Sequence, residues 1–374
     1  MGNIGVNMYS KTEKVIMWLS TFEFMSYKKA MFVINAFEDL EEFFDNMDTY
    51  KPVLKTCFEP DEVNALLSER NFSYIDNVIK NYDKLNIVVV TIRSKAYPEL
   101  LKEIDSSPIM LYCRGDISLL QKDALGVVGT RRATKYGKDC CAKFVQDIAS
   151  EDIVIVSGLA DGIDTVAHKS CLGVNGKTIA VLGGGLLNIY PSSNIRLAEE
   201  IVEKGGLLIS EYKPNEQSLT YHFPIRNRII AGLSKAVFIV EATEKSGSMH
   251  TKNYAIEYNR EVFALPGRIS DIYSVGCNKC IQNGQARMVL GSLEIIDFFG
   301  KNSKEQASKH IVQLTCEEQL IYDALLGYEK NFDELLRETG LEAKVLQTLL
   351  MRMSLQGVVD RLPNNYYSLI QGDL

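Results

Sequence analysis

The chain has 374 residues, of which 46% are hydrophobic and 24% are charged, and its formal net charge is −7. This length suits two or three domains, and the balanced composition excludes a fibrous or intrinsically disordered protein. No apolar run reaches the roughly 18 residues that a membrane-spanning helix requires, and the first residues lack the pattern of a secretory signal. We therefore expect a cytoplasmic protein with no membrane partner.

The charge is unevenly distributed along the chain. Residues 1–80 hold 8 Lys+Arg and 13 Asp+Glu, and residues 311–374 hold 5 and 10, so each terminal segment has a net charge of −5. Residues 81–310 hold 28 and 25, which gives this middle segment a net charge of +3. If a polyanion binds this chain, we expect it to bind the middle segment.

The eight cysteines are scattered, and only Cys277 and Cys280 have the CxxC spacing of a zinc-ligand pair. The sequence offers no second pair at a suitable distance, and the four histidines do not have ligand spacing either. We expect reduced, mostly buried thiols, no metal site and no cofactor.

Residues 1–80 predict a small helical accessory domain, with short helices over Lys11–Leu19 and Glu38–Met47. Asp61 precedes the apolar-periodic stretch Val63–Leu67, so a further helix capped by Asp61 is expected there. No pattern in this segment points to chemistry.

Residues 81–300 alternate short β-branched runs with helical periodicity. Continuous apolar strands separated by helices indicate a mainly parallel sheet covered on both faces, which is a doubly wound α/β domain. Ligands of such sheets bind at the carboxyl ends of the strands. The expected strands are Ile87–Ile92, Ala124–Gly129, Ile153–Ser157, Thr178–Leu182, Gly206–Ser210, Ala236–Val240 and Glu261–Leu265, and the expected helices are Tyr136–Ser150, Ile163–Leu172, Asn194–Lys204, Asn227–Leu233 and Met249–Asn259.

A polar stretch predicts a linker over residues 301–315, and residues 316–374 predict a winged-helix domain. Its helices are expected over Glu317–Leu326, Phe332–Glu338 and Glu342–Gln356, with a hairpin over Val358–Leu369. A winged helix that binds duplex DNA normally carries cations on its recognition helix, whereas this module is acidic. A protein-interaction or regulatory role is therefore favoured over duplex binding.

Four of the expected strands run into loops of small or polar residues. Glycines in such loops let backbone N–H groups approach an anion, and the following helix N-terminus adds a positive dipole end. Because the loops share one edge of the sheet, they favour a surface that holds phosphates or a nucleotide, although turn sterics explain single glycines equally well. The candidate residues are Gly129, Arg131 and Tyr136 in the first loop region, Ser157 and Gly158 in the second, Gly183–Gly185 in the third, and Ser246, Gly247 and Ser248 in the fourth.

Two cations are candidates for phosphate contact. Arg131 lies two residues beyond a strand end and offers a bidentate fork, whereas Lys177 immediately precedes a strand and offers a point charge. The alternative for each is a solvated surface charge, and for Lys177 the two alternatives are evenly balanced.

The segment His222–Arg228 places Phe223 next to a proline and close to two arginines. Phe223 could stack on a base while Arg226, Asn227 and Arg228 contact phosphates. Alternatively, Phe223 belongs to the core and the arginines are intramolecular clamps.

His168 lies four residues after Asp164 on an expected helix, a spacing that predicts a hydrogen bond between the two side chains and a structural role for the histidine. The chain lacks GxSxG, HExxH, a paired-aspartate metal cluster and a Walker A lysine motif. With no catalytic constellation in the sequence, we expect a binding protein rather than an enzyme.

In their order along the chain, these loops resemble those of the DprA/Smf (DNA-processing protein A) family. The resemblance covers about residues 85–290, and its most specific part is the string Phe223–Ser234. Other matching segments are Gly129-x-Arg131, Tyr136-Gly137, Ser157–Asp164, Ala167-His168, Gly183 to Pro191, Ser210-Glu211, Glu241-Ala242, Ser246–Ser248, Pro266-Gly267 and Gly276–Asn278. The segment Glu317–Leu369 also resembles the winged-helix module of the family.

The resemblance implies a Rossmann-like core that binds single-stranded DNA, forms a homodimer and delivers the DNA to the recombinase RecA during natural transformation or related recombination. In the family, the GxR loop, a cation at the position of Lys177 and the FPxRNR segment contact nucleic acid. These features correspond here to Arg131, Lys177, Phe223 and Arg226–Arg228. The chain departs from the family pattern at Asp161, where a cation is usual, and at Cys280, in a segment associated with self-association.

Two other functions stay open at this point. Related phosphoribohydrolases hydrolyse nucleoside monophosphates, but their PGGxGT loop is replaced here by Ser246–Met249. A regulatory adaptor that has lost DNA binding is the other alternative. Asp161 favours the adaptor, whereas the presence of Arg131 and Arg226 opposes it.

Overall fold

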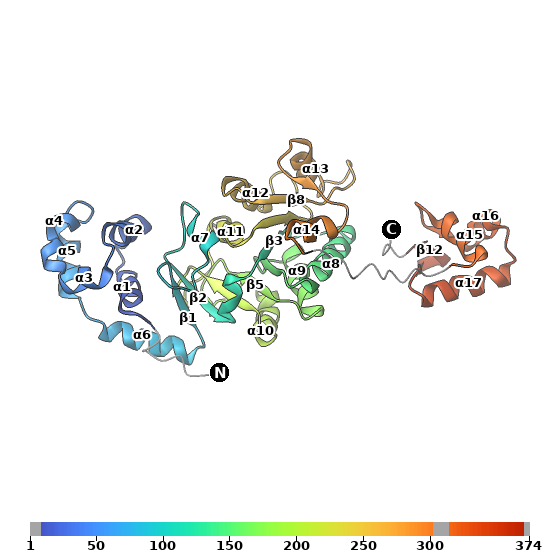
Figure 1. Ribbon diagram of the computed structural model, residues 1–374. Helices are drawn as coiled ribbons and strands as arrows, with labels where there is room; N and C mark the ends of the chain where they lie inside the picture. The colour runs from blue at the N-terminus through green and yellow to red at the C-terminus, as the bar shows by residue number, and fades with distance from the viewer. Residues whose placement is uncertain (1–8, 302–313, 370–374) are drawn as a thin grey trace. The chain divides into compact units, whose positions relative to one another are not determined.

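The apolar runs of the middle segment form a nine-stranded sheet in the computed structural model, which describes residues 9–301 and 314–369. The described residues belong to two compact units, Met1–Lys301 and Asn302–Leu374. The linker expected over residues 301–315 lies almost entirely outside the described residues. Figure 1 shows the elements of both units, which are described one at a time below.

The sheet of the first unit has the strand order β1-β2-β6-β5-β4-β3-β7-β8-β9. The strands from β3 to β9 pair in parallel, whereas β2 pairs antiparallel with both β6 and β1. The mainly parallel sheet predicted from the sequence is therefore confirmed. The bounds are β1 Val88–Thr91, β2 Met110–Gly115, β3 Ala124–Val128, β4 Val154–Ser157, β5 Thr178–Val181, β6 Leu207–Ser210, β7 Ala236–Ile239, β8 Glu261–Ala264 and β9 Arg287–Met288.

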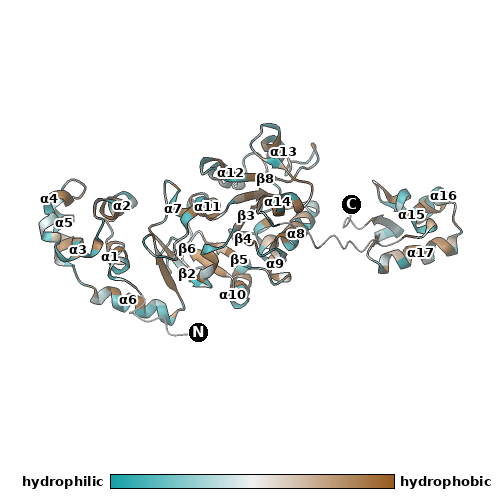
Figure 2. Ribbon diagram, in the orientation of Figure 1, coloured by the Kyte–Doolittle hydropathy of each residue, from teal (hydrophilic) through white to brown (hydrophobic). Residues whose placement is uncertain are grey.

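Every residue of β3, β4, β5, β6 and β7 is buried, which is why these strands are continuous apolar runs rather than alternating ones. Figure 2 shows the hydrophobic colour concentrated on the strands of this sheet. From β3 the chain moves outward through β4, β5 and β6, and it then returns to place β7 on the other side of β3. The direction of winding reverses at β3 and β7, and the ligand crevice of a doubly wound sheet forms at such a reversal.

Two separate hydrophobic clusters cover the two faces of this sheet. One contains residues of α8, α9 and α14, and the other contains residues of α11, α12 and α13. The layered α/β/α architecture expected from the sequence is therefore present. The helices are α7 Glu99–Lys102, α8 Lys135–Ser150, α9 Ile163–Gly173, α10 Ile195–Glu203, α11 His222–Leu233, α12 Ser248–Glu257, α13 Val275–Gln282 and α14 Leu293–Phe298.

Helix α11 begins at His222, although the sequence predicted a helix only from Asn227. Pro224 lies in the first turn, where a proline costs little because its missing N–H would have no partner inside the helix. The segment Phe223–Arg228 is therefore helical, and successive side chains point in different directions around the axis. This local geometry decides which members of the segment face solvent.

The N-terminal helices pack onto one end of the sheet and share a hydrophobic cluster with residues of β1 and β2. Trp18 lies at the centre, with its ring 5.1 Å from Phe22 and 5.2 Å from Phe44 in edge-on geometry. The hydroxyl of Tyr9 accepts a hydrogen bond from the backbone N–H of Val89 (2.9 Å), which ties the segment to β1. The helices are α1 Lys11–Leu19, α2 Tyr27–Ala36, α3 Leu40–Asp45, α4 Lys51–Leu54, α5 Pro60–Ser68 and α6 Ser73–Lys84.

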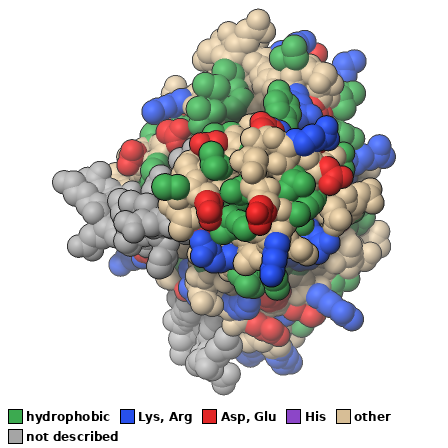
Figure 3. All heavy atoms as spheres, turned by 90° about the vertical axis from the view of Figure 1, so that its right-hand side faces the viewer, with side chains coloured by type: hydrophobic (Ala, Val, Ile, Leu, Met, Phe, Trp, Pro, Cys, Tyr) green, Lys and Arg blue, Asp and Glu red, His purple; other side chains and the backbone are tan. Residues whose placement is uncertain are grey.

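The described part of the second unit, residues 314–369, has three α-helices and a three-stranded sheet of order β10-β12-β11, which confirms the winged-helix prediction. Asn364 and Asn365 make the turn of the hairpin with φ values of 62° and 59°, a left-handed conformation that asparagine tolerates better than most residues. The elements are α15 Cys316–Leu325, β10 Lys330–Asn331, α16 Phe332–Thr339, α17 Ala343–Leu355, β11 Val359–Leu362 and β12 Tyr366–Leu369. On the face shown in Figure 3, basic and acidic side chains are interspersed among hydrophobic ones.

One ion pair between a buried carboxylate and an exposed arginine joins α15 to α17. Glu318 is 1% exposed, and it accepts hydrogen bonds from the backbone N–H of Thr315 (2.7 Å) and from Nε of Arg352 (2.7 Å). Burial alone would raise the pKa of Glu318, but these hydrogen bonds and the charge of Arg352 outweigh it, so the pKa is lowered. The stabilisation is therefore fully present above the pKa of the unfolded chain, about 4.3, and is lost as the pH falls through the lower native value.

We expect Glu318→Gln to destabilise the second unit by about 1–3 kcal/mol near neutral pH, because the buried side chain would lose the charge-assisted hydrogen bonds that Glu318 accepts from Thr315 and Arg352. The difference from the wild type should shrink as the pH falls below the unfolded value of about 4.3 and through the lower native pKa of Glu318, where the native carboxylate becomes protonated. Hydrogen exchange of peptides from α15 and α17, followed by mass spectrometry in the full chain, measures this local stability.

Glu317→Gln is the matched control, because Glu317 is exposed on the same helix. Equal exchange rates for the two variants across the whole pH range would show that the Glu318–Arg352 pair contributes nothing to stability.

Candidate nucleic-acid interface

The carboxyl ends of β3, β4, β5 and β7 bring four loops together at one edge of the sheet. These loops cover residues 129–134, 158–162, 182–191 and 240–247. The loop residues named from the sequence, with the exception of Lys177, lie in these segments or directly beside them. The edge therefore contains most of the expected site.

A pocket at this edge is built around Phe223. The guanidinium carbon of Arg131 lies 5.5 Å from the centre of the Phe223 ring, within the range of a cation–π contact. The centre of the Tyr190 ring lies 5.5 Å from the centre of the same ring, with the two planes tilted by 45°. The lining residues are Arg131, Gly158, Ala160, Asp161, Tyr190, Pro191, Phe223 and Arg226.

Phe223 can lie here because Gly183 has no side chain: a Cβ at that position would be 2.8 Å from the phenyl ring. Arg131 is exposed and, among the described residues, takes part in no ion pair. Asp161, the acidic residue at the rim, accepts a hydrogen bond from the hydroxyl of Ser193 (2.8 Å). The pocket thus presents one available cation, Arg131, beside the Phe223 ring, and a second aromatic ring, Tyr190, next to Phe223.

Arg226 points inward from α11 and is 4% exposed. Its Nη1 donates to the carbonyl of Gly158 (2.8 Å) at the end of β4 and to the carbonyl of Val181 at the end of β5. A Cβ at Gly158 would be 2.5 Å from this guanidinium and 2.8 Å from a carboxylate oxygen of Asp164, so only glycine fits between the two charged groups. Arg226 is therefore a clamp on two strand ends, the alternative left open by the sequence.

Asp164 supports the same corner of the site. Its carboxylate accepts hydrogen bonds from the backbone N–H groups of Gly158 (3.1 Å) and Ala160 (3.4 Å). Burial raises the pKa of Asp164 to about 6, although the neighbouring charge of Arg226 opposes this shift. The loop after β4 is thus folded around a buried carboxyl group.

The predicted hydrogen bond between Asp164 and His168 is wrong. Nδ1 of His168 instead pairs with the hydroxyl of Thr178 on β5 (2.7 Å), because the Asp164 carboxylate is directed to the backbone of the preceding loop. Complete burial lowers the pKa of His168 to about 3, so the ring is neutral. The histidine has the structural role expected for it, with a different partner.

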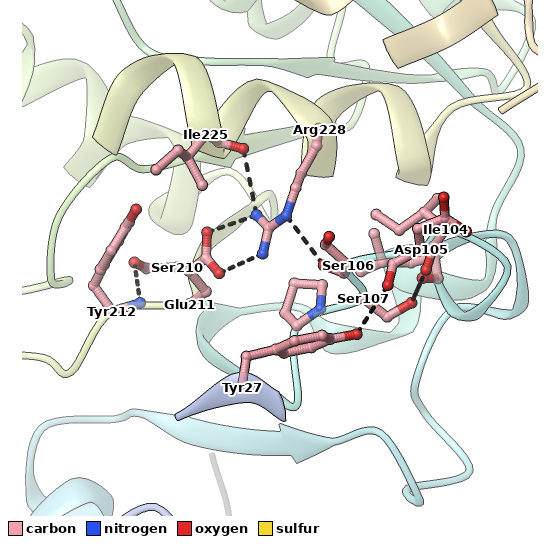
Figure 4. Close-up of polar contacts among 12 residues, drawn as sticks. Tyr27, Ile104, Asp105, Ser106, Ser107, Ser210, Glu211, Tyr212, Ile225 and Arg228 are labelled. Carbon is pink, nitrogen blue, oxygen red and sulfur yellow. Dashed lines mark hydrogen bonds and ion pairs between the residues drawn. The ribbon is translucent and has the colours of Figure 1, made fainter. Parts of the chain in front are cut away.

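Arg228 is also held within the protein, as Figure 4 shows. Nη1 and Nη2 donate to the two carboxylate oxygens of Glu211 (2.7 and 2.6 Å), and Nε donates to the carbonyl of Ser106 (3.0 Å). On the adjoining loop, the hydroxyl of Tyr27 from α2 donates to the carbonyl of Asp105 (3.1 Å). All three guanidinium nitrogens of Arg228 have internal partners, which leaves none free for a phosphate.

Asn227 lies between these two arginines and reaches a different loop. Its Nδ2 donates to the carbonyl of Gly247 (3.2 Å) in the loop before α12. In that loop the hydroxyls of Ser246 and Ser248 lie 2.8 Å apart, and Gly247 is exposed. The predicted residues Ser246–Ser248 therefore lie beside the segment that carries Phe223.

Two other predicted residues form the base of the edge. Gly129 follows β3 and packs under Ile163 of α9. Ser157 is fully buried, and its hydroxyl donates to the carbonyl of Val127 on the neighbouring strand (2.7 Å). In this conformation the hydroxyl of Ser157 links β4 to β3 and does not face the pocket.

Lys177 lies at the opposite edge of the sheet. It precedes β5, so it is at the amino end of the strand, and its Nζ donates to the carbonyl of Lys204 (2.8 Å). The structure does not bring this cation to the loops that surround Phe223, because the carboxyl and amino ends of a strand lie at opposite edges.

Glu241 fills the position where a doubly wound sheet holds a phosphate. It is 1% exposed and accepts hydrogen bonds from the backbone N–H of Thr134 (2.9 Å) and from its hydroxyl (2.5 Å), at the N-terminus of α8. The positive end of α8 is thereby neutralised by a carboxylate of the chain itself.

Glu241 and Tyr190 were not named as site residues from the sequence, although both lie in matching family segments. A signal was available for each: Glu241 directly follows an expected strand, and Tyr190 follows the glycine-rich loop. Within residues 9–301 and 314–369, no group of three or more His, Cys, Asp or Glu side chains is placed to hold a metal ion. In the same ranges, no helix combines the length and the apolar character needed to cross a membrane.

Both units of the chain match models of known protein families. The model described as DNA recombination-mediator protein A matches residues 88–300, and the model described as DprA winged helix domain matches residues 305–365. DNA processing protein DprA of Bacillus subtilis (strain 168) is 41% identical over 243 residues, which cover 64% of this chain and 82% of the relative. Protein Smf of Escherichia coli (strain K12) is 39% identical over 287 residues, which cover 74% of this chain and 76% of the relative.

Two solved structures of relatives share the fold. DprA of Streptococcus pneumoniae superposes with a TM-score of 0.64 at 36% identity, over 77% of this chain and 98% of that chain. DNA processing protein A of Helicobacter pylori, whose structure was described for its single-stranded DNA binding mode, superposes with a TM-score of 0.53 at 32% identity, over 57% of this chain and 96% of that chain. The chain therefore belongs to the DNA recombination-mediator protein A family, known as DprA or Smf.

Proposed function

We propose that this protein binds single-stranded DNA at the carboxyl edge of its parallel sheet and helps to load the recombinase RecA onto that DNA during natural transformation or related recombination. The observation that carries the proposal is the pocket formed by Arg131, Phe223 and Tyr190. Proteins that bind single strands without sequence preference combine stacking aromatic rings with a cationic surface along the backbone. The Helicobacter pylori relative described for single-stranded DNA binding supports the same assignment.

The predicted site residues divide into contacts and positioning residues. Arg131, Tyr136, Phe223, Asn227 and Ser246–Ser248 are at least partly exposed, with the exception of Ser248, and we assign them to DNA contact. The other five predicted residues of the edge are buried, internally bonded or, for Gly129, packed against Ile163; they are Gly129, Ser157, Gly158, Arg226 and Arg228.

Arg226 holds the strand ends in place, and Arg228 holds the loop of residues 104–107. Gly158 leaves room for the Arg226 guanidinium, and the Ser157 hydroxyl links β4 to β3. Because Phe223 is on the same helix as both arginines, the clamps determine where its ring lies. Lys177 has no place in the proposed contact surface.

Glu241 argues against the phosphoribohydrolase alternative. A nucleoside monophosphate bound at the reversal point of the sheet would place its phosphate at the N-terminus of α8, where the Glu241 carboxylate already lies. Like charges at that distance repel, so binding would require Glu241 to move. We propose a non-catalytic protein.

We also propose a homodimer formed through the Rossmann-like domain. Strand β9 is at the edge of the sheet and has an unpaired side. Three hydrophobic side chains there are exposed, Met288 by 48%, Leu290 by 73% and Leu293 by 56%. A second copy of the chain would cover them.

We expect Arg131→Ala to weaken binding of oligothymidine by roughly ten- to a hundredfold, since a charge-assisted contact contributes about 1.5–3 kcal/mol. The slope of log K against log salt should become shallower by about 0.7, the loss of one phosphate contact to a single strand. Fluorescence anisotropy of labelled oligothymidine at several salt concentrations measures both quantities.

Lys122→Ala is the matched control, because it removes one exposed cation at the opposite edge of the sheet. Lys177→Ala tests the sequence prediction for that residue, and we expect it to behave like Lys122→Ala. Equal binding by Arg131→Ala and the wild type would show that the DNA-binding site lies elsewhere on the protein. Absence of binding by the wild type would contradict the proposed function.

We expect Glu211→Gln to lower the free energy of unfolding of the first unit by about 3–5 kcal/mol, because it leaves the buried Arg228 without its charged partner. Urea unfolding monitored by circular dichroism measures this loss. Glu200→Gln breaks an exposed pair with Lys204 and should cost no more than about 1 kcal/mol. If Glu211→Gln is as stable as Glu200→Gln, then the Glu211–Arg228 pair contributes no more than an exposed pair and Arg228 is not a structural clamp.

We expect the wild-type protein to shorten the lag before RecA assembles on single-stranded DNA, and Arg131→Ala to shorten it much less. The lag in DNA-dependent ATP hydrolysis by RecA measures nucleation. A normal lag with wild-type protein that is bound to the DNA would contradict the RecA part of the proposal and leave DNA binding intact.

A further inference from the structure

The loop after β8 projects hydrophobic and basic side chains at the same edge of the sheet as the Phe223 pocket. Ile269 is 95% exposed and Ile272 is 64% exposed, which is unusual for isoleucine. Arg268 is also exposed, and its side chain takes part in no ion pair among the described residues. No residue between 9 and 301 covers these three side chains.

The loop is anchored at both ends, so its tip is held in a defined place. Asn278 of α13 donates to the carbonyl of Gly267 (3.0 Å) and accepts from its N–H (3.1 Å). At the other end, the carbonyl of Tyr273 accepts a hydrogen bond from the N–H of Ala242 (2.7 Å) in the loop after β7. The exposed isoleucines are therefore carried by an ordered loop between two fixed points.

A chain of contacts connects this loop to the pocket. Arg131 lies against Phe223, and Tyr136, five residues later in the same loop and helix, donates from its hydroxyl to the carbonyl of Pro266 (2.8 Å). The ring of Tyr136 is 43% exposed. Aromatic surface and cations thus continue from the pocket to the residues just before Arg268.

The charges along this path favour a polyanion. Arg132, Lys135 and Lys245 are exposed beside it. Of the carboxylates in the loops after β7 and β8, Glu244 is neutralised by Lys279 (2.8 Å), whereas Asp271 is directed to the backbone N–H of Tyr273 (3.0 Å) and keeps its charge. The exposed cations therefore outweigh the charge of Asp271 along this path.

We propose that residues 268–272 form a second subsite for the same single strand, in which Arg268 contacts a phosphate and Ile269 packs against a base. This inference rests on the proposed function and extends its site. The path runs from β5, under Phe223, to β8, a distance of four strand spacings or roughly 19 Å. At a stacked spacing of about 3.4 Å this distance holds about six nucleotides, and fewer when the strand is stretched. Apolar side chains that pack between bases are known from other DNA-binding proteins.

The test compares short and long strands. Oligothymidine of about three nucleotides reaches the pocket alone, whereas oligothymidine of about ten nucleotides reaches both subsites. Arg268→Ala with Ile269→Ser should leave affinity for the short strand unchanged and weaken the long strand by about tenfold, with a salt slope shallower by about 0.7. Arg131→Ala should weaken both lengths. Lys122→Ala is the matched loss of one cation at the opposite edge.

The outcomes separate this inference from the function on which it rests. If the loop variant binds both lengths as the wild type does, while Arg131→Ala binds neither well, the second subsite is refuted and the pocket stands. If the wild type binds no oligothymidine, the proposed function itself fails. Sedimentation of the loop variant decides the remaining case: a loss of self-association that accounts for the weaker binding would make the loop a contact between two copies of the chain and would overturn the subsite.

Discussion

The carboxyl edge of the sheet depends on one buried guanidinium. Strand ends have carbonyl groups that the sheet no longer pairs, and such groups normally turn to water or to a side chain. Arg226 enters from α11 and binds the last carbonyls of two adjacent strands, while the Asp164 carboxylate beside it binds the backbone of the following loop. Removing the guanidinium would leave Asp164 buried without a charged neighbour, at a cost of about 3–5 kcal/mol. The loops that surround the pocket have their positions because this pair fixes the strand ends beneath them.

The direction of the Arg226 side chain also explains why Phe223 lies at the surface of the pocket. On a helix, residues three positions apart lie on the same face, so Phe223 and Arg226 both project from α11 toward the strand ends. Arg226 is buried between the strand ends, and Phe223, nearer the start of the helix, stays partly exposed. The phenyl ring then rests on Gly183 and meets Arg131 from the neighbouring loop. At the reversal point, Glu241 blocks the deep phosphate position, and what is left is a shallow surface of rings and cations. Such a surface suits a continuous strand better than a single nucleotide.

The strands and most helices could be predicted because burial on both faces forces continuous apolar runs, as in Ala124–Val128 and Ala236–Ile239. Strand β2 was missed because it pairs with β1 and β6, and such distant pairings leave no local signal. The start of α11 was misplaced because proline in a first helical turn looks like loop sequence. For the site, residue types indicated cations and rings, but not their directions. Arg131 and Arg226 are both arginines and cannot be distinguished by residue type. In the structure, however, Arg131 is exposed and Arg226 is only 4% exposed.

Trp18 is the single tryptophan of the chain, and it lies far from the pocket residues in the sequence and in a different part of the first unit. Its ring is 2% exposed, and its indole N–H donates to the carbonyl of Glu69 (3.0 Å), so the N-terminal helices enclose it completely. Intrinsic emission excited at the indole band therefore comes from one defined place. It will shift to longer wavelength when the N-terminal helices open, and the absence of indole from the Phe223 pocket keeps direct stacking by a base from quenching it. The protein thus carries its own optical probe for the unfolding of the N-terminal helices.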